Sequence, residues 1–243
     1  MRRLLPSPGD LDQAGLIEAY RLPGGRSLRV NFIVSLDGSI TLAGRSGGLG
    51  SPGDLRIFQL LRALSDVVLV GSGTANAEGY RPILAGSPVG RLRTSIGRSA
   101  TAPIAIVSRR ASLDPDSGLV TGAVSPTILV TCAAADPRRR AVLEEAGVTV
   151  LVCGEDDVDL PAALDRLAGL GHEQVVCEGG PQLLHAALAA GAVDELDLSV
   201  APVLAGGEKH LLEAALPAAQ RLELRQLLEE DGVLFTRYAV SAQ

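Results

Sequence analysis

The sequence predicts an α/β fold with a mostly parallel central sheet, antiparallel strands near the C-terminus, and helices on both faces of the sheet. Short, continuous apolar runs alternate with helical patterns, as in a parallel sheet that is covered on both sides. The last third of the chain instead alternates apolar and polar residues, which indicates strands with one solvated face. The 243 residues, 47% of them hydrophobic, suit one large α/β domain or two small ones.

Six apolar runs rich in β-branched residues are the predicted parallel strands. They lie at 30–34, 67–70, 104–107, 127–130, 148–152 and 175–177. Four further segments have helical periodicity, and the alternation of the two patterns predicts a layered fold. These predicted helices lie at 53–64, 136–146, 160–169 and 181–190. Residues 195–200 and 233–240 are expected to be the antiparallel strands that complete the sheet.

Residues 81–99 are the best candidate for a long loop. The segment is rich in Gly, Ser and Arg and lacks sustained periodicity. We therefore expect Arg91, Arg93 and Arg98 to form a solvated face, and a rim that gathers anions is the second interpretation.

Charge and composition exclude several classes of function. Twenty-two basic and 28 acidic residues give a net charge of −6, so no positive field favours nucleic acid or an anionic membrane. Lys209 is the single lysine and does not follow a glycine, which excludes a P-loop that ends in Gly-Lys-Ser/Thr. The chain lacks a secretory h-region and an apolar run of about 18 residues, so we expect a cytoplasmic protein.

The cysteines and histidines predict buried thiols and no metal site. Cys132, Cys153 and Cys177 are odd in number, far apart and set in apolar runs, which suits a reducing compartment. The three histidines are equally scattered, and no Cys-x-x-Cys occurs.

The segment Gly44-Arg45-Ser46-Gly47-Gly48 matches the Gly-x-Ser-x-Gly pattern of serine hydrolases. That pattern requires a sharp turn from a strand directly into a helix. Here more glycine follows, and the next helix start is signalled only at Ser51. A flexible glycine loop is therefore the better interpretation.

Two glycine turns each follow a predicted buried strand and open a helix. The first, Gly71 to Asn76, lacks the last small residue of a dinucleotide fingerprint, so by itself it fits a plain turn as well as a phosphate loop. The second has Gly179 and Gly180, and then Pro181 at the favoured first helical position. Backbone amides and the helix dipole favour an anion at such a place. Together the two turns could hold the two ends of one dinucleotide.

Ser108, Arg109 and Arg110 follow another predicted strand. A guanidinium beside a hydroxyl suits the 2′-phosphate that distinguishes NADP from NAD. A solvated loop is the alternative, and the residues alone leave both open.

Asp54 also has two interpretations. It lies three residues after Ser51, as the acidic partner of a capping box does. It also precedes Ile57, Phe58 and Leu61 by three, four and seven positions, so its carboxylate lies on the apolar face of the helix. A carboxyl that is partly desolvated there could supply a proton.

Four segments together resemble the reductase domain of the bifunctional riboflavin-biosynthesis deaminase/reductase. They are residues 31–38 (NFIVSLDG), 61–74 (LRALSDVVLVGSGT), 178–181 (EGGP) and 193–207 (VDELDLSVAPVLAGG). The resemblance divides the chain into an N-terminal extension, 1–27, and a single reductase domain, 28–243. It implies a dihydrofolate-reductase-like fold, a homodimer, and NADPH-dependent reduction of the ribosyl group of 5-amino-6-(5-phosphoribosylamino)uracil.

The resemblance also implies roles for individual residues. Cofactor-binding residues would be Gly71, Ser72, Gly73, Thr74, Ser108, Arg109, Gly179, Gly180, Pro181, Gln182 and Leu183. The substrate side would be lined by Asn31, Ser35, Asp54 and Glu178. Of these, Asp54 and Glu178 are the candidate catalytic residues, and Asp54 stands where the dihydrofolate-reductase fold places the acid that binds the pteridine ring.

The chain departs from the family pattern in ways that affect the substrate. Asn31 replaces the usual lysine, and residues 78–82 (EGYRP) replace Asp-Asn-Pro or Asp-Asp-Pro. The zinc deaminase motifs are absent, so a stand-alone reductase is expected. A reductase of dihydrofolate or another pteridine, and a nucleotide-binding regulator without turnover, are the alternatives. The C-terminal strands and residues 201–207 offer an apolar edge that a symmetric partner could cover.

Overall fold

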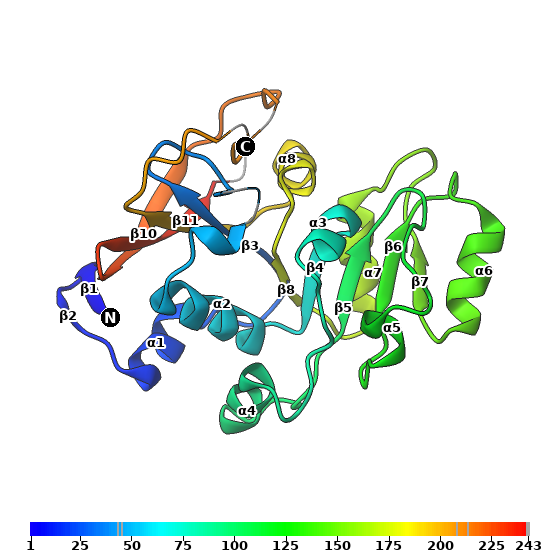
Figure 1. The fold of residues 1–243 in the computed structure, drawn as a ribbon, viewed down its shortest axis with the longest axis horizontal. Coiled ribbons are helices and arrows are strands. Elements are labelled where there is room, and N and C mark those ends of the chain that lie inside the picture. The colour runs from blue at the N-terminus through cyan, green and yellow to red at the C-terminus, as the bar shows by residue number, and fades with distance from the viewer. Residues whose placement is uncertain (43, 45, 208, 213, 242–243) are drawn as a thin grey trace.

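A mixed, eleven-stranded sheet runs through the described part of the molecule (Figure 1). The computed structural model describes residues 1–42, 44, 46–207, 209–212 and 214–241. In spatial order the strands are β2 (Gly9–Asp10), β1 (Arg2–Leu5), β10 (Leu222–Glu230), β11 (Val233–Val240), β9 (Glu195–Ala201), β3 (Ser27–Ser35), β8 (Gln174–Cys177), β4 (Val67–Gly71), β5 (Ile104–Val107), β6 (Ile128–Thr131) and β7 (Thr149–Val152). Neighbouring strands from β9 to β7 are parallel. The strands from β11 to β2 continue the sheet antiparallel.

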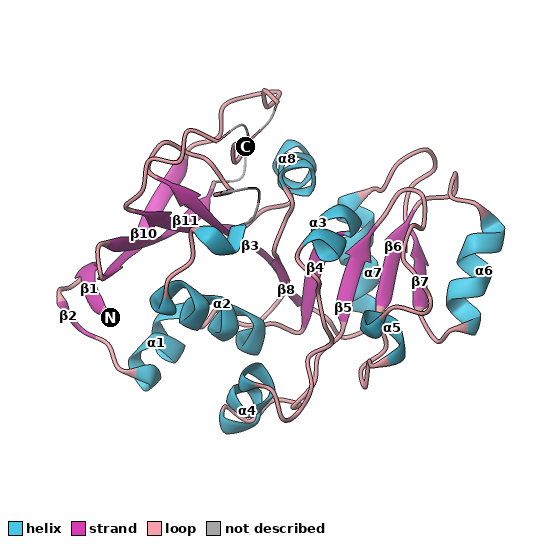
Figure 2. Ribbon diagram, in the orientation of Figure 1, coloured by secondary structure: helices cyan, strands magenta, loops and turns pink. Residues whose placement is uncertain are grey.

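Helices cover both faces of this sheet (Figure 2). They are α1 (Gln13–Tyr20), α2 (Pro52–Leu64), α3 (Ser72–Ala77), α4 (Pro88–Ser95), α5 (Gly118–Thr121), α6 (Pro137–Glu145), α7 (Leu160–Gly169) and α8 (Pro181–Ala189), with a 3₁₀ turn η1 (Ser46–Gly48). Buried residues of α1 to α6 belong to one core cluster, and those of α7 and α8 belong to the other. The predicted fold class is therefore confirmed.

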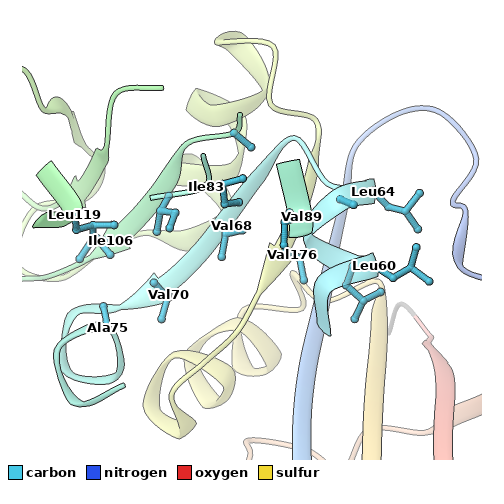
Figure 3. Close-up of a cluster of buried hydrophobic side chains, with 14 of the residues drawn as sticks. Leu60, Leu64, Val68, Val70, Ala75, Ile83, Val89, Ile106, Leu119 and Val176 are labelled. Atoms are coloured by element: carbon cyan, nitrogen blue, oxygen red, sulfur yellow. The ribbon is translucent and has the colours of Figure 1, made fainter. Parts of the chain in front are cut away.

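The central strands are buried on both faces because their side chains alternate between the two clusters. Val68 and Val70 of β4 pack with Ile106 and Val176 under α2, as Figure 3 shows. Val67 and Leu69 face the opposite cluster. This alternation explains why a continuous apolar run was the correct signal for a parallel strand.

The prediction of a loop over 81–99 was wrong, because α4 lies within this segment. Ser87 is the N-cap of α4, and its hydroxyl accepts a hydrogen bond from the Gly90 amide. Arg93 is buried, and its guanidinium donates to the main-chain oxygens of Arg62 and Ser65 at the end of α2. Arg93 therefore packs α4 against α2. It also supplies hydrogen bonds to carbonyls at the end of α2 that would otherwise bond to water.

The segment 1–27 adds β1 and β2 to the edge of the sheet and α1 to one of its faces. A buried group of charges joins α1 to the strands. Arg29 of β3 donates to the main-chain oxygen of Tyr20 at 2.8 Å and to the Glu195 carboxylate at 2.6 Å. Arg237 donates to the same carboxylate at 2.6 Å, and Asp197 lies 3.0 Å from the Arg29 guanidinium.

All three cysteines are buried and have free thiols, as predicted. Burial raises the pKa of the Cys177 thiol to about 12. Over the described residues, no three His, Cys, Asp or Glu side chains group as metal ligands. No helix in the same part of the chain is long and apolar enough to cross a membrane.

Candidate active site

A large cavity opens at the carboxyl ends of β3, β8, β4 and β5, the edge at which α/β sheets bind ligands. Its volume is about 1820 Å³. Pockets of about 300–1,000 Å³ hold a drug-sized ligand, so this one has room for a dinucleotide and a second small molecule. One wall is formed by α2, and the starts of α3 and α8 lie at its floor.

The two glycine turns predicted from the sequence meet in this cavity. The Gly71 amide donates to the Gly179 carbonyl at 2.7 Å. A Cβ on Gly180 would lie 2.6 Å from the Thr74 hydroxyl oxygen, so the close approach of the two turns requires glycine there. Most residues of both turns line the cavity, whereas Gly179 lies behind the surface. The lining residues of the turns are Gly71, Ser72, Gly73, Thr74, Gly180, Pro181, Gln182 and Leu183.

Both turns lead into helix starts that no described side chain caps. The first-turn amides of α3 and α8 are therefore available to a ligand. Two such starts beside each other favour a ligand with more than one phosphate, because the N-terminal end of each helix dipole attracts negative charge.

A group of three serine hydroxyls continues the site towards β5. Ser108 and Ser112 lie 2.8 Å apart between their hydroxyl oxygens, and the Ser112 hydroxyl donates to Ser72 at 3.3 Å. Arg109 and Arg110 are exposed and line the same part of the cavity. The predicted hydroxyl and guanidinium are thus together, with two further hydroxyls beside them.

Asp54 lines the cavity from the first turn of α2. The Ser51 hydroxyl accepts a hydrogen bond from the Asp54 amide at 3.1 Å, which confirms Ser51 as the predicted N-cap. The Asp54 carboxylate points elsewhere, and it accepts a hydrogen bond from Ser199 on β9. Burial raises the pKa of Asp54, and the Ser199 hydrogen bond opposes that rise.

Glu178 also lines the cavity, but its carboxylate is fully engaged by neighbouring side chains. Arg62 donates to both oxygens, at 2.7 and 2.6 Å, and the Tyr80 hydroxyl donates at 2.6 Å. The Arg62 guanidinium lies between two rings, 4.2 Å from the centre of Phe58 and 5.0 Å from that of Tyr80. The ion pair of Arg62 with Glu178, together with Tyr80, therefore joins α2, the segment after α3 and the second glycine turn.

The remaining predicted substrate residues differ in position. Asn31 is half-buried and lines the cavity. Ser35 is 1% exposed and does not line it. Its hydroxyl donates to Asp37 at 2.5 Å, and Asp37 accepts further bonds from the Ala205 and Gly206 amides. These hydrogen bonds lower the pKa of Asp37 and hold the segment after β9 against the turn after β3.

The glycine loop after β3 borders the cavity without the geometry of a hydrolase. The Ser46 hydroxyl donates to Glu78 at 2.8 Å, and α2 begins only at Pro52. Gly44, Ser46 and Gly47 line the cavity. Arg45, part of the Gly-x-Ser-x-Gly pattern, lies outside the described residues.

The RibD C-terminal domain family matches residues 26–232. The chain belongs to this family. A relative from Methanothermobacter thermautotrophicus, named 2,5-diamino-6-ribosylamino-4(3H)-pyrimidinone 5′-phosphate reductase, is 30% identical over 217 residues, which is 87% of this chain and 96% of the relative. A protein of the same name from Archaeoglobus fulgidus is 29% identical and covers 73% of this chain and 81% of its own length.

Among solved structures, a pyrimidine reductase-like protein from Corynebacterium diphtheriae is 28% identical, with a TM-score of 0.75. The match covers 90% of this chain and 93% of that one. The family and the reductase class that the sequence predicted are thereby confirmed.

The sequence analysis of this RibD C-terminal domain identified Asp54 as a site residue, but it missed most of the other residues of α2 that line the cavity. Asp54, Phe58 and Arg62 lie four residues apart, so they share one face of α2, and all three line the cavity. That spacing was a usable signal for Phe58 and Arg62. Tyr80 and Ser112 carried no such signal, because each is placed by a loop.

Proposed function

We propose that the chain is an NADPH-dependent reductase of a 6-ribosylaminopyrimidine 5′-phosphate in riboflavin biosynthesis. The observation that carries the proposal is the contact between Gly71 and Gly179, which brings two uncapped helix starts to one cavity beside the Asp54 carboxyl. The uracil named from the sequence, 5-amino-6-(5-phosphoribosylamino)uracil, and the 2,5-diaminopyrimidinone named in the relatives are the two candidate substrates.

The residues present fit a dinucleotide phosphate. The space around Gly73 is open, and Gly180 leaves no room for a side chain beside Thr74, so both turns expose main chain. The amides of Ser72, Gly73, Gln182 and Leu183 would bind the diphosphate. When bound, the nicotinamide supplies the hydride.

Preference for NADPH over NADH would come from the β5 end of the cavity. Ser108, Ser112 and Ser72 offer hydroxyls, and Arg109 offers a guanidinium, to a phosphate on the adenosine ribose. A doubly charged phosphate gains most from such charge-assisted bonds. Arg110 lies next to this group and adds positive charge.

Asp54 and Glu178 would have different tasks on the substrate side. Asp54 has a raised pKa and an accessible carboxyl, so it can orient the substrate or relay the proton that hydride addition requires. Glu178 is held by Arg62 and Tyr80, so it would shape the wall next to the second glycine turn. Asn31 would offer its carboxamide to the same substrate.

We also propose a homodimer. Leu36 and Leu204 are 67% and 76% exposed, and Leu222, Leu224 and Leu234 are exposed on β10 and β11. Apolar side chains in such number favour burial against a second copy.

An assay of NADPH oxidation with three substrates tests the function. Oxidation with either pyrimidine 5′-phosphate, and none with dihydrofolate, is the expected result. Oxidation with dihydrofolate alone would identify a pteridine reductase. Binding of NADPH without oxidation of any substrate would identify a regulator.

A further inference from the structure

The first turn of α2, which carries Asp54, rests on the antiparallel part of the sheet. Asp54 is the third residue of the helix, and its carboxyl accepts a hydrogen bond from Ser199 of β9. Phe235 of β11 is the register partner of Ser199, so the two side chains lie next to each other on the sheet face below α2. Glu230 is the last residue of the neighbouring strand β10. Residues from three strands therefore lie beneath this part of the helix.

Gly53, the second residue of α2, is buried at the closest point of this contact. A Cβ at Gly53 would lie 2.9 Å from the Phe235 ring atom Cζ and 3.0 Å from Glu230 Oε1. Carbon atoms in good contact are about 3.5–4.0 Å apart, so a side chain here would require a movement of about 0.6–1.1 Å. Alanine is the better helix former, so it is the close approach to the sheet, and not the helix, that requires glycine.

Neither of the side chains below this glycine moves easily. Phe235 is 1% exposed and belongs to the core cluster beneath α2, where close packing leaves little space for the ring to move. The Glu230 carboxylate is held by Arg56, which donates to its two oxygens at 3.1 and 2.9 Å. The turn of the helix is therefore the part that would move, and it would carry Asp54 away from Ser199.

We propose that Phe235 and Glu230 are positioning residues of the proposed reductase. They form a seat for Gly53 that sets the height of the first turn of α2 above the sheet. The seat thereby holds the Asp54 carboxyl at the Ser199 hydroxyl and at the cavity. Neither residue of the seat lines the cavity, so neither acts on a ligand directly. The proposal rests on the proposed function, in which Asp54 faces the substrate.

The hydrogen bond from Ser199 gives the seat a signature that a purely structural role lacks. Burial raises the pKa of Asp54, and the Ser199 hydrogen bond opposes that rise because it stabilises the charged form. When the turn is lifted, the bond is lost and the pKa of Asp54 rises further. The loss of one hydrogen bond to a charged group corresponds to about one to two pH units.

The charged groups on the elements packed against Asp54 form ion pairs. Arg56 of α2 holds Glu230 of β10, and this contact lowers the pKa of Glu230. Asp197 of β9 lies 3.0 Å from Arg29 of β3, and burial raises the pKa of Asp197. Its titration must therefore be told apart from that of Asp54, and a variant at Asp54 does so. Further along α2 and β11, the ion pairs are Arg62 with Glu178 and Arg237 with Glu195.

The seat is tested from the helix side by Gly53→Ala and from the sheet side by Phe235→Tyr, whose added hydroxyl extends from the ring atom nearest to Gly53. The pKa of Asp54 is measured in the free protein by carbon-13 NMR of its carboxyl carbon, and Asp54→Asn assigns the signal. We expect this pKa to rise by about one to two units in both variants. Circular dichroism and the melting temperature establish that they are folded. Phe235→Tyr leaves α2 unaltered, so it serves where Gly53→Ala does not fold.

Oxidation of NADPH with the proposed pyrimidine 5′-phosphates is the second measurement. A displacement of about 1 Å can lower turnover about 100-fold, so we expect kcat to fall about 10- to 100-fold in both variants. The KM for NADPH should stay unchanged, because the glycine turns lie at other strands. The double variant Gly53→Ala/Phe235→Leu removes the outer ring atoms that the new methyl group would meet. It should therefore regain turnover relative to Gly53→Ala and restore the pKa of Asp54.

Gly169→Ala is the matched control. Gly169 lies in α7 with open space where a Cβ would be, so the same substitution adds a methyl group without a close contact. It should leave kcat and the pKa of Asp54 unchanged. An unchanged pKa of Asp54 in folded Gly53→Ala and Phe235→Tyr overturns the inference, and so does a folded double variant that regains neither quantity. A shifted pKa without any oxidation of NADPH by the unmodified chain supports the seat and overturns the proposed function.

Discussion

Replacement of Arg62 by alanine tests the ion pair at the centre of the site. The change removes two bonds of 2.6–2.7 Å to Glu178 and the contacts with the Phe58 and Tyr80 rings. It also leaves the Glu178 carboxylate, whose side chain is 3% exposed, with the Tyr80 hydroxyl as its remaining described side-chain partner. Breaking a buried pair from one side leaves an uncompensated charge, which costs about 3–5 kcal/mol.

That loss should be visible as a large fall in melting temperature. For a chain of this length, 1 kcal/mol lowers the midpoint by about 2–4 °C, so Arg62→Ala should melt about 6–20 °C lower. Tyr80→Phe removes one hydrogen bond to a charged group, about 1.5–3 kcal/mol, and should shift the midpoint by less. The assay is thermal or denaturant unfolding followed by circular dichroism.

The exposed pair between Arg225 and Glu223, 2.8 Å apart and more than half exposed on both sides, provides the control. Arg225→Ala should cost under about 1 kcal/mol. The double variant Arg62→Met/Glu178→Met should lose clearly less stability than the two single variants added together, because it leaves no buried charge unpaired. Additive losses, or an Arg62→Ala effect no larger than that of Arg225→Ala, would refute the reasoning.

Four further predictions concern catalysis, the pH dependence of stability, the cofactor and assembly. Asp54→Asn should lower turnover by about 100-fold or more with the affinity for NADPH unchanged. Because burial raises the pKa of Asp54, ionisation is harder in the folded state, so the free energy of unfolding should fall as the pH rises above about 4. The part of this slope that Asp54 causes should be lost in the variant, whereas the part that comes from Asp197, whose pKa is also raised by burial, should remain. Arg109→Ala should reduce the preference for NADPH over NADH by roughly 10- to 150-fold, and equal dissociation constants in the unmodified chain would contradict the assignment. Sedimentation should give twice the chain mass of 25.0 kDa, and a monomer at micromolar concentration would count against the dimer.

Local signals predicted the parallel half of the sheet well. The apolar runs at β4 and β5 are buried on both faces, and Ser51 with Pro52 defined the start of α2. Strands β1 and β10, in the antiparallel part of the sheet, went unpredicted, because half-exposed strands with charges such as those of Arg2 and Glu229 lack an apolar run.

The candidate site also has parts that local sequence signals predicted and parts that they could not predict. Glycine turns after buried strands are local features, and both lie at the cavity as expected. The bond between Arg62 and Glu178 joins residues 116 positions apart, so no local pattern could reveal it. Ser35 lies within a family-like motif, but its hydroxyl is used by Asp37 instead of a ligand.

The burial of all three thiols makes the unmodified chain a ready background for site-directed labelling. A thiol must be accessible and ionised to react with a maleimide, and Cys177 is buried with a pKa of about 12. A cysteine introduced at an exposed position such as Val124, which is 70% exposed, would carry a fluorophore without prior removal of the native cysteines. Conversely, the native thiols react with such a reagent only when the core opens globally, so their labelling rate reports unfolding. The same reagent can therefore label a chosen surface site or follow unfolding.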